Sequence, residues 1–529
     1  MFRSAFGGYR PTDLYKNWRH LFHDQAGAIL WAPSLGRLIA RGELTEGARR
    51  LAPHLFELRS GIGKLIIDAK RINDDIAVHY SQQSVRVDWM VDAVNGGDKK
   101  VPWHTRRENY EWYRQRSNGT RGATLRVIED NQLQFRLVAT PEIEAGALHK
   151  EGYKLLLLHH SFAISRAEAA AIRKFVRAGG VVVSDAQVGT FDGNGAPVTA
   201  GVFDDLFGIR DIPAHHAPVR DERAAVKLDL AKASKLGLNL TGINLRVLPA
   251  FSEVKATDGI VLACDGKMPM VVAKAHGKGL AVYLNVSISP YLLWRLDLKS
   301  PEKSRGFRQL IGALAARAGV HRTWAVTRHG TKDLLPCTEV FKYVDGSYLY
   351  FAAMRNYQAR EHGLGGDLRA RPGPGMLHPR TQKPEAVSIR LPHRGHVYNV
   401  RARKYLGRVE QVNTILDPIL PALYAVLPAK VESMAAVAAF DRSTGYAALT
   451  ASLKAEDNSK LGSHVLHVEV TDPKGKRWLP LLKNYAAPKG KLAARIFLGT
   501  NAAPGHWQLL VRDAATGVGA TVAVAVQKE

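Results

Sequence analysis

The spacing of hydrophobic and polar positions changes along the chain, and the first change separates residues 1–72 from the rest. This region has an amphipathic helical pattern at 13–23, an apolar run at 26–32 and a longer helical pattern at 46–69. One strand between two helices cannot form a sheet alone. We therefore expect residues 1–72 to be the C-terminal remnant of a (β/α)8 barrel, or a piece that docks on the next domain.

Residues 73–325 have the pattern of a parallel sheet covered by helices. Continuous apolar runs at 153–159 and 181–184 flank a helical pattern at 166–178, which ends at Gly179 and Gly180. Strands are also expected at 76–80 and 134–139, a helix at 107–116, a hairpin at 269–284 and a closing helix at 303–318. The pattern predicts a flavodoxin-like or class I glutamine amidotransferase-like domain.

After Val320 the helical periodicity gives way to short alternating segments separated by turns. We divide this part into a β-sandwich domain at 326–435 and an immunoglobulin-like β-sandwich at 436–529. The predicted fold class is thus α/β plus all-β, in four units.

Composition excludes several classes of protein and leaves the compartment open. With 46% hydrophobic and 23% charged residues the chain is ordinarily globular, and no apolar run approaches a membrane span or a secretory signal. Cys264 and Cys337 are too few for a disulfide framework and lack CxxC spacing, so no metal or cofactor is expected. The net charge of +26 favours an anionic partner.

Several segments of the second unit carry a resemblance to a known family. They are Tyr-Lys-Leu-Leu-Leu-Leu-His-His at 153–160, Ile-Ser-Arg-Ala-Glu at 164–168, the Phe-Val-Arg-Ala-Gly-Gly run at 175–184, Asp-Asp-Leu-Phe-Gly-Ile at 204–209 and the hairpin at 275–284. Together they resemble the trimerisation domain of family 42 β-galactosidases over residues 75–320. Residues 18–31 are similar to the seventh helix and eighth strand of the barrel that precedes it.

The resemblance implies a carbohydrate partner and a homotrimer. The family hydrolyses glycosides with two glutamates, one after barrel strand four and one after strand seven. Both positions are expected before residue 1, and Asp13, Asp24 and Glu43 receive no catalytic role. The leading hypothesis is a non-catalytic assembly or glycan-binding portion of a glycoside hydrolase relative. The alternatives are a polyanion-binding module, or a hydrolase completed by a partner chain.

Two places could contact a sugar. His79, Tyr80, Ser81 and Gln82 lie at the carboxyl end of a predicted strand, where open α/β sheets bind ligands. Hydrogen bonding of this cluster to the barrel remnant is the favoured alternative. Trp31 ends the predicted barrel strand and could stack on a ring or pack in a domain seam.

Three further motifs favour structural roles. Ser161 with His159 or His160 could form a nucleophilic dyad, and His20, His23 and Asp24 share one helix face as metal ligands can. A strand-end loop and a helix surface explain both patterns better. The Gly61 to Lys64 segment lacks the phosphate-loop pattern, so we expect close helix packing there.

Positive charge is concentrated between Arg355 and Arg408, where twelve Lys and Arg face three acidic residues. An exposed polyanion patch is one interpretation, and a dispersed solvated surface is the other. Arginine matches sulfate and carboxylate geometry, so an anionic polysaccharide ranks above nucleic acid. The candidate residues are Arg369, Arg371, Arg380, Lys383, Arg401, Arg403 and Lys404.

Overall fold

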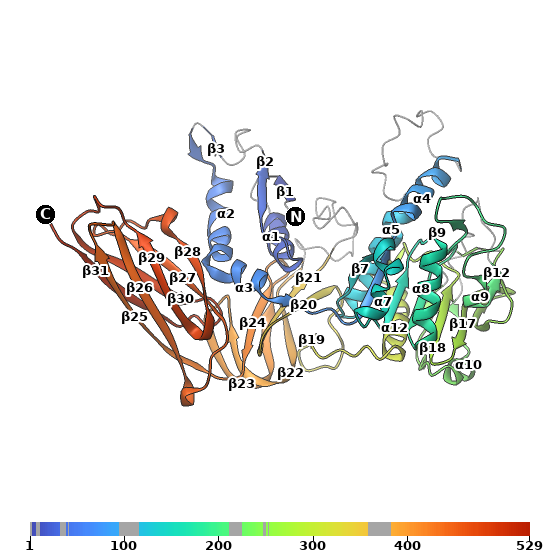
Figure 1. The fold of residues 1–529 in the computed structure, drawn as a ribbon. Coiled ribbons are helices and arrows are strands. Elements are labelled where there is room, and N and C mark those ends of the chain that lie inside the picture. The colour runs from blue at the N-terminus through green and yellow to red at the C-terminus, as the bar shows by residue number, and fades with distance from the viewer. Residues whose placement is uncertain are drawn as a thin grey trace.

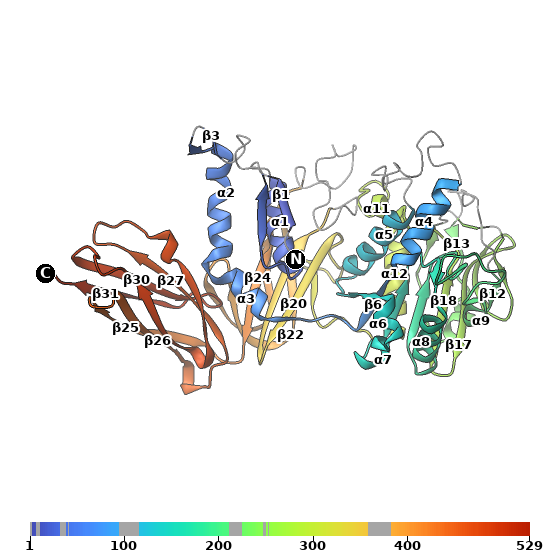
Figure 2. The ribbon, with the colours of Figure 1, turned by 45° about the horizontal axis from the view of Figure 1, so that its top comes forward.

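The computed structural model describes residues 3–6, 11–31, 39–40, 42–94, 116–210, 225–246, 250–251, 253–357 and 382–528. An α/β unit and a C-terminal β-sandwich lie at opposite ends of the molecule, with an antiparallel sheet and the N-terminal helices between them (Figures 1 and 2). No described helix is long and apolar enough to cross a membrane. Mixed α/β architecture followed by β-sheets agrees with the predicted fold class.

The N-terminal unit contains more strands than the single one that the sequence suggested, among them the short hairpin of β3 (Ile39–Ala40) and β4 (Glu43–Leu44). β1 (Arg3–Phe6) pairs in parallel with β2 (Ala28–Trp31), and α1 (Pro11–Phe22) connects them. The expectation of a lone strand is wrong, because the four-residue β1 has little apolar pattern of its own and is recognisable only by its pairing.

The long helical pattern at 46–69 forms two helices with a break between them. α2 (Glu46–Glu57) is capped by Thr45 and is followed by a π-helical turn, η1 (Leu58–Ile62), and by α3 (Gly63–Asp68). Gly61 adopts a φ of 103°, and a Cβ there would lie 2.6 Å from the Cβ of Ala514 in the C-terminal sandwich. Close packing, as predicted, is the role of this glycine.

The α/β unit is built on a seven-stranded sheet in the order β16-β17-β18-β10-β8-β6-β7, whose last five strands are parallel. The expected βαβ unit and hairpin are present. Their bounds are β6 (Ile76–Tyr80), β7 (Arg136–Ala139), β8 (Leu155–Leu158), β10 (Val181–Ser184), β16 (Ile260–Asp265), β17 (Met268–His276) and β18 (Gly279–Leu284).

Helices cover both faces of this sheet (Figure 1). One face packs against α5 (Arg116–Asp130) and α12 (Glu302–Arg317), and the other against α6 (Thr140–Glu144) and α8 (Arg166–Arg177). The helix expected at 107–116 lies outside the described residues, apart from Arg116 where α5 begins. The sequence did not indicate α4 (Gln82–Val94) or most of α5.

Shorter elements complete this end of the molecule. They are α7 (Ala147–Lys150), α9 (Asp204–Phe207), α10 (Leu230–Lys235), α11 (Tyr291–Trp294), β9 (Ala163–Ile164), β11 (Phe191–Asp192), β12 (Ile209–Arg210), β13 (Ala225–Val226), β14 (Leu245–Arg246) and β15 (Lys255–Ala256).

The middle of the molecule is an antiparallel sheet in the order β19-β22-β24-β21-β20-β5, with β23 paired to β22. Its first strand in sequence, β5 (Lys70–Arg71), comes from the end of the N-terminal unit and pairs with β20. The others are β19 (Ala325–Arg328), β20 (Thr338–Asp345), β21 (Tyr348–Arg355), β22 (Glu385–Asn399), β23 (Lys404–Leu416) and β24 (Ala422–Leu427).

The C-terminal sandwich has two sheets, β25-β26-β29 and β28-β27-β30-β31. The division placed at 435/436 falls inside β25, since the small residues of this strand alternate too weakly to mark its start. The bounds are β25 (Val431–Asp441), β26 (Tyr446–Ala455), β27 (His464–Thr471), β28 (Lys483–Ala487), β29 (Lys491–Phe497), β30 (Gly505–Asp513) and β31 (Gly519–Val526).

Candidate functional site

The carboxyl ends of β6 and β8 form the point in the parallel sheet where successive connections diverge. The chain leaves β6 toward β7 on one side and leaves β8 toward β10 on the other. Ligands of open α/β sheets bind at such points. The predicted residues from His79 to Gln82 and the histidines at 159 and 160 follow these two strands, so the fold brings the two polar segments together.

His79 is held between two side chains from other elements. Its Nδ1 lies 2.7 Å from Oγ of Ser161, and its Nε2 lies 2.8 Å from Oε1 of Glu168 in the first turn of α8. Serine, histidine and carboxylate lie in the order of a hydrolytic relay, but here the serine contacts Nδ1 and the carboxylate lies at Nε2, the reverse of a Ser-His-Asp triad. Neither oxygen of Glu168 makes a hydrogen bond in the described part of the chain. Ser161 and Glu168 are 0% exposed and His79 is 1% exposed. These three buried side chains thus connect β6, the segment after β8 and α8.

The predicted residues that follow His79 make hydrogen bonds near the carboxyl end of β6. The hydroxyl of Ser81 accepts a hydrogen bond from the backbone N–H of Ser84 at 3.0 Å, at the start of α4. Tyr80 donates to Oε1 of Gln82 at 3.3 Å, and Gln82 is exposed. Among the described residues the side-chain contacts of His79 stay within the α/β unit, and none of them reaches the N-terminal unit. A sugar-binding role for Tyr80 and Gln82 stays a prediction.

His159 points to the opposite face of the sheet. It lines a cavity of about 20 Å³ with Thr124, Val127 and Asp185, and neither ring nitrogen meets a hydrogen-bond partner in the described part of the chain. Burial, with the positive charge of Arg121 as the next cause, holds the pKa of His159 well below its usual value of 6.5. The imidazole is therefore neutral, and the space beside it suits a water rather than a sugar.

His160 has a left-handed backbone with a φ of 49° and is held by two carboxylates. Its backbone N–H donates to Oδ1 of Asp185 at 2.8 Å, and its Nε2 lies 2.7 Å from Oδ1 of Asp88. Ser161 has its imidazole contact with His79, not with His159 or His160. The hypothetical dyad therefore paired the serine with the wrong histidine, because its partner lies 82 positions earlier in the chain.

A second polar cluster lies between α1, α5 and β20, and we call it the seam cluster: Arg19, His23, Arg126, Glu129, Glu339 and Asn356. Arg19 Nε lies 2.9 Å from Glu339 Oε2, and the Nδ2 of Asn356 donates to Glu129 at 2.8 Å and to Glu339 at 3.0 Å. Both glutamates are at most 1% exposed. The amide of Asn356 thus links the two buried carboxylates.

Burial and neighbouring charges shift the pKa values of the seam-cluster side chains in different directions. Burial raises the pKa of Glu129 to about 7, against the lowering effect of Arg126. Despite its burial, the pKa of Glu339 lies well below its usual value, since Arg19 and His23 stabilise the carboxylate. His23, whose Nε2 lies 2.9 Å from Glu339 Oε1, has its pKa lowered to about 3, chiefly by burial. At neutral pH His23 is neutral and Glu339 is charged.

The same contacts rule out the proposed metal face on α1. His23 faces Glu339, whereas the carboxylate of Asp24 lies 3.8 Å from Arg71. His20 is buried and Asp24 is exposed. Among the described residues no three His, Cys, Asp or Glu side chains converge as metal ligands do.

The predicted polyanion patch is only partly visible. Arg369, Arg371 and Arg380 lie outside the described residues. Lys383, Arg403 and Lys404 are exposed. Arg401 is different: its Nε lies 2.7 Å from Oε1 of Glu57, and its guanidinium sits 5.0 Å from the ring of Trp18.

Arg401 therefore ties the middle sheet to α2 and is already paired, which the sequence could not reveal because Glu57 is 344 positions away. The other candidate aromatic residue, Trp31, is the last residue of β2 and pairs with Phe6 of β1. The role of Trp31 in sugar stacking stays a prediction.

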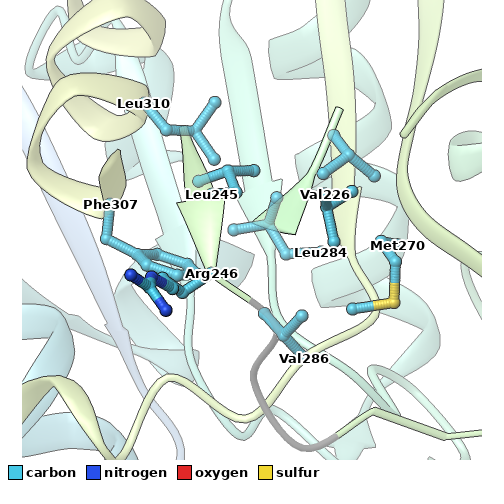
Figure 3. A pocket seen from close by; sticks show the side chains of 9 residues that line it. Val226, Leu245, Arg246, Met270, Leu284, Val286, Phe307 and Leu310 are labelled. Atoms are coloured by element: carbon cyan, nitrogen blue, oxygen red, sulfur yellow. The ribbon is translucent and has the colours of Figure 1, made fainter. Parts of the chain in front are cut away.

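An apolar pocket lies between β13, β14 and α12 (Figure 3). Val226, Leu245, Leu284 and Phe307 point toward a cavity of about 10 Å³. This volume holds at most about one water. The pocket is a packing gap of the α/β unit and offers no room for a ligand.

Comparisons with known proteins give structural neighbours only. No protein-family model matches the chain, and no curated protein is similar to it. Among solved structures, the β-galactosidase from Bacillus circulans sp. alkalophilus is 14% identical, with 80% of this chain and 55% of that chain covered at a TM-score of 0.49. The β-galactosidase from Rahnella sp. R3 is 13% identical, with 79% and 51% covered at a TM-score of 0.47.

A third neighbour is the family 42 exo-carrageenase from Bacteroides ovatus, 8% identical, with 81% of this chain and 42% of that chain covered at a TM-score of 0.38. The chain spans about half the length of the two β-galactosidases. The structural neighbours of this protein are thus glycoside hydrolases, among them family 42 β-galactosidases.

Proposed function

We propose that this chain is a non-hydrolytic, glycan-binding and assembly portion of a β-galactosidase-type system. The observation that carries the proposal is the burial of Glu129 and Glu339 in the seam cluster. A glycosidase pair must stand about 5–10 Å apart on either side of a glycosidic bond, with the sugar between the carboxyl groups. These two carboxylates instead share one amide group, that of Asn356.

The resemblance supports the same proposal at the barrel remnant. The family places its nucleophile directly after strand seven. We assign β1 to that strand, which moves the expected nucleophile position from before residue 1 to residues 7–10. Residues 7–10 are Gly-Gly-Tyr-Arg, which contain no carboxylate. Hydrolysis by this chain would therefore need a nucleophile from elsewhere, as in the alternative of a partner chain that completes the enzyme.

Assembly is the second part of the proposal. The sequence resemblance covers a domain that trimerises in its family, and the chain would form a cyclic homotrimer through residues 75–320. Rigid linkage would let such a trimer present three sandwiches in fixed directions. The seam cluster supplies that linkage, since it joins α1, α5 and β20 in one buried network.

Turnover measurements on the purified chain test the first part. We expect no cleavage of an aryl β-galactoside, and the Glu129→Gln and Glu339→Gln variants should lose stability without any change in that null activity. Turnover that disappears in Glu129→Gln, at an unchanged melting temperature, would overturn the proposal. Light scattering tests the second part, and a monomer mass at micromolar concentration would remove the trimer.

A further inference from the structure

A wide cleft opens where the α/β unit meets the middle sheet, and two arginines line it. Arg322 lies on the segment between α12 and β19, and Arg390 lies in β22. The cleft has a volume of about 510 Å³, far larger than the packing gaps of the α/β unit. His393, Glu410 and Gln411 complete its polar lining.

The strand pairing explains why these side chains meet. Arg390 pairs with Ala325 of β19 on one side and with Gln411 of β23 on the other. The β22–β23 register shifts between Arg390 and Gly395, as in a β-bulge, which redirects side chains and disrupts local pairing. The guanidinium of Arg322 is anchored from the other unit, because its Nη1 donates to the carbonyl oxygen of Asn131 at 3.4 Å.

The charges of the cleft are not balanced. No carboxylate of the described chain lies within ion-pair distance of Arg322 or Arg390, although Glu410 lines the same cleft. Desolvation, together with the positive charge of Arg390, lowers the pKa of Arg322. An arginine stays protonated at neutral pH even so, and an anion bound beside two arginines of one cleft stabilises both charges.

We propose that this cleft binds an oxyanion, a sulfate or carboxylate carried on a pyranose unit of an acidic polysaccharide, with Arg322 and Arg390 as its ligands. This inference rests on the proposed glycan-binding function and names its substrate class. Guanidinium groups bind such oxyanions through paired N–H donors. Gln411 and Glu410 offer acceptors for the hydroxyl groups beside the anion.

The lining favours a sugar over nucleic acid. No Trp, Tyr or Phe of the described chain lines the cleft, so His393 and the guanidinium planes are all that it offers a base for stacking. Glu410 would also repel a chain of closely spaced phosphates, whereas it can accept hydrogen bonds from sugar hydroxyls. The cleft is distinct from the patch predicted from sequence, because none of the seven patch residues lines it.

Calorimetric titration of the full chain with four probes tests the inference. The probes are a sulfated galactan oligosaccharide, its desulfated counterpart, a uronate oligosaccharide and a single-stranded oligonucleotide. We expect the sulfated or uronate probe to bind about tenfold more tightly than the desulfated one, with a strong dependence on salt.

The double variant Arg322→Gln and Arg390→Gln should lose about tenfold or more of that affinity, and its binding of the desulfated probe should stay unchanged. The matched control is the double variant Arg177→Gln and Arg305→Gln, which removes the same charge from exposed positions outside both the cleft and the predicted patch. We expect the control to lose less than about threefold. Melting temperatures verify that both variants are folded.

Three results would overturn the inference. They are equal losses in the cleft variant and the control, equal affinity for sulfated and desulfated galactan, and an oligonucleotide that binds more tightly than any glycan with the same dependence on Arg322 and Arg390. Binding of the desulfated galactan in those cases would leave the proposed function standing. If the wild-type chain binds none of the glycans, the proposed glycan-binding function fails instead.

Discussion

Arg19 and Glu339 lie 320 positions apart in the sequence and form a fully buried ion pair, with Nε and Oε2 2.9 Å apart. Arg19 is on α1 and Glu339 on β20, so the pair joins the N-terminal unit to the middle sheet. Arg19 also lies 3.5 Å from Glu129 of α5, which extends the connection to the α/β unit. One guanidinium thus contacts carboxylates from two other parts of the fold.

Breaking this pair should be costly. We expect Arg19→Met to lower the free energy of unfolding by about 3–5 kcal/mol, since it leaves buried carboxylates without their counter-charge. Urea unfolding measures the change. The matched control is Arg50→Met, whose partner Glu46 is 72% exposed, and its effect should stay within about 0.5 kcal/mol. Equal changes in the free energy of unfolding of the two variants would show that the buried pair stabilises the fold no more than an exposed pair does.

The relay at His79 should behave as a coupled unit. We expect His79→Leu to cost about 3 kcal/mol or more, because Glu168 remains buried without a partner. The double variant His79→Leu and Glu168→Leu should recover a large part of that loss, because it removes both partners of the buried contact. A double-mutant cycle by urea unfolding measures the coupling. Additive losses would contradict the direct contact between the two side chains.

Gly61 allows the break between α2 and α3 to touch the C-terminal sandwich. Gly61→Ala should destabilise the chain by more than the roughly 1 kcal/mol that a left-handed backbone alone costs, because its Cβ would lie 2.6 Å from the Cβ of Ala514. Gly152→Ala is the control, since Gly152 has a φ of 71° and open space around it. Thermal unfolding of both variants isolates the steric part, and equal shifts would refute the close contact.

Acid should destabilise the chain partly through His159. Its pKa lies well below 6.5 in the folded state, whereas the unfolded chain takes up the proton near pH 6.5. The unfolded state then binds more protons, so stability falls with falling pH by up to about 1.4 kcal/mol per pH unit for this group. His159→Leu should reduce that slope between about pH 6.5 and 5, as measured by urea unfolding at several pH values.

The control for this measurement is His321→Leu, which changes an exposed histidine. Its pH dependence should match that of the unaltered chain. A slope in His159→Leu as steep as in the control would mean that His159 is protonated in the folded state.

Local sequence patterns predicted much of the fold. The strands at 76–80 and 181–184 and the helix at 166–178 were placed to within a residue, since apolar runs and a Gly-Gly stop act over a few neighbouring positions. The weakly patterned elements were missed. β1 has only four residues, and α5 has mixed small and polar residues throughout its length.

The candidate sites were less predictable. His79 was singled out because ligands bind at strand ends of open α/β sheets. The sequence could not reveal that Ser161 and Glu168 contact its ring and that α8 covers it. Arg401 looked like one more exposed cation, and only its contact with Glu57 shows that it is paired. Arg390 was counted among the twelve cations between Arg355 and Arg408 but was not named as a patch residue, and Arg322 lies outside that segment and outside every motif.

The sequence by itself determined the order of the units, the parallel strands of the α/β sheet and the excess of positive charge. These properties depend on composition and on neighbours a few residues apart, which any conformation of the chain shares. Only the tertiary structure decided which charges are paired and which face open space. Burial and Coulomb attraction act through distance in space, and the fold sets the distances between Arg19 and Glu339, Arg401 and Glu57, and the two arginines of the cleft.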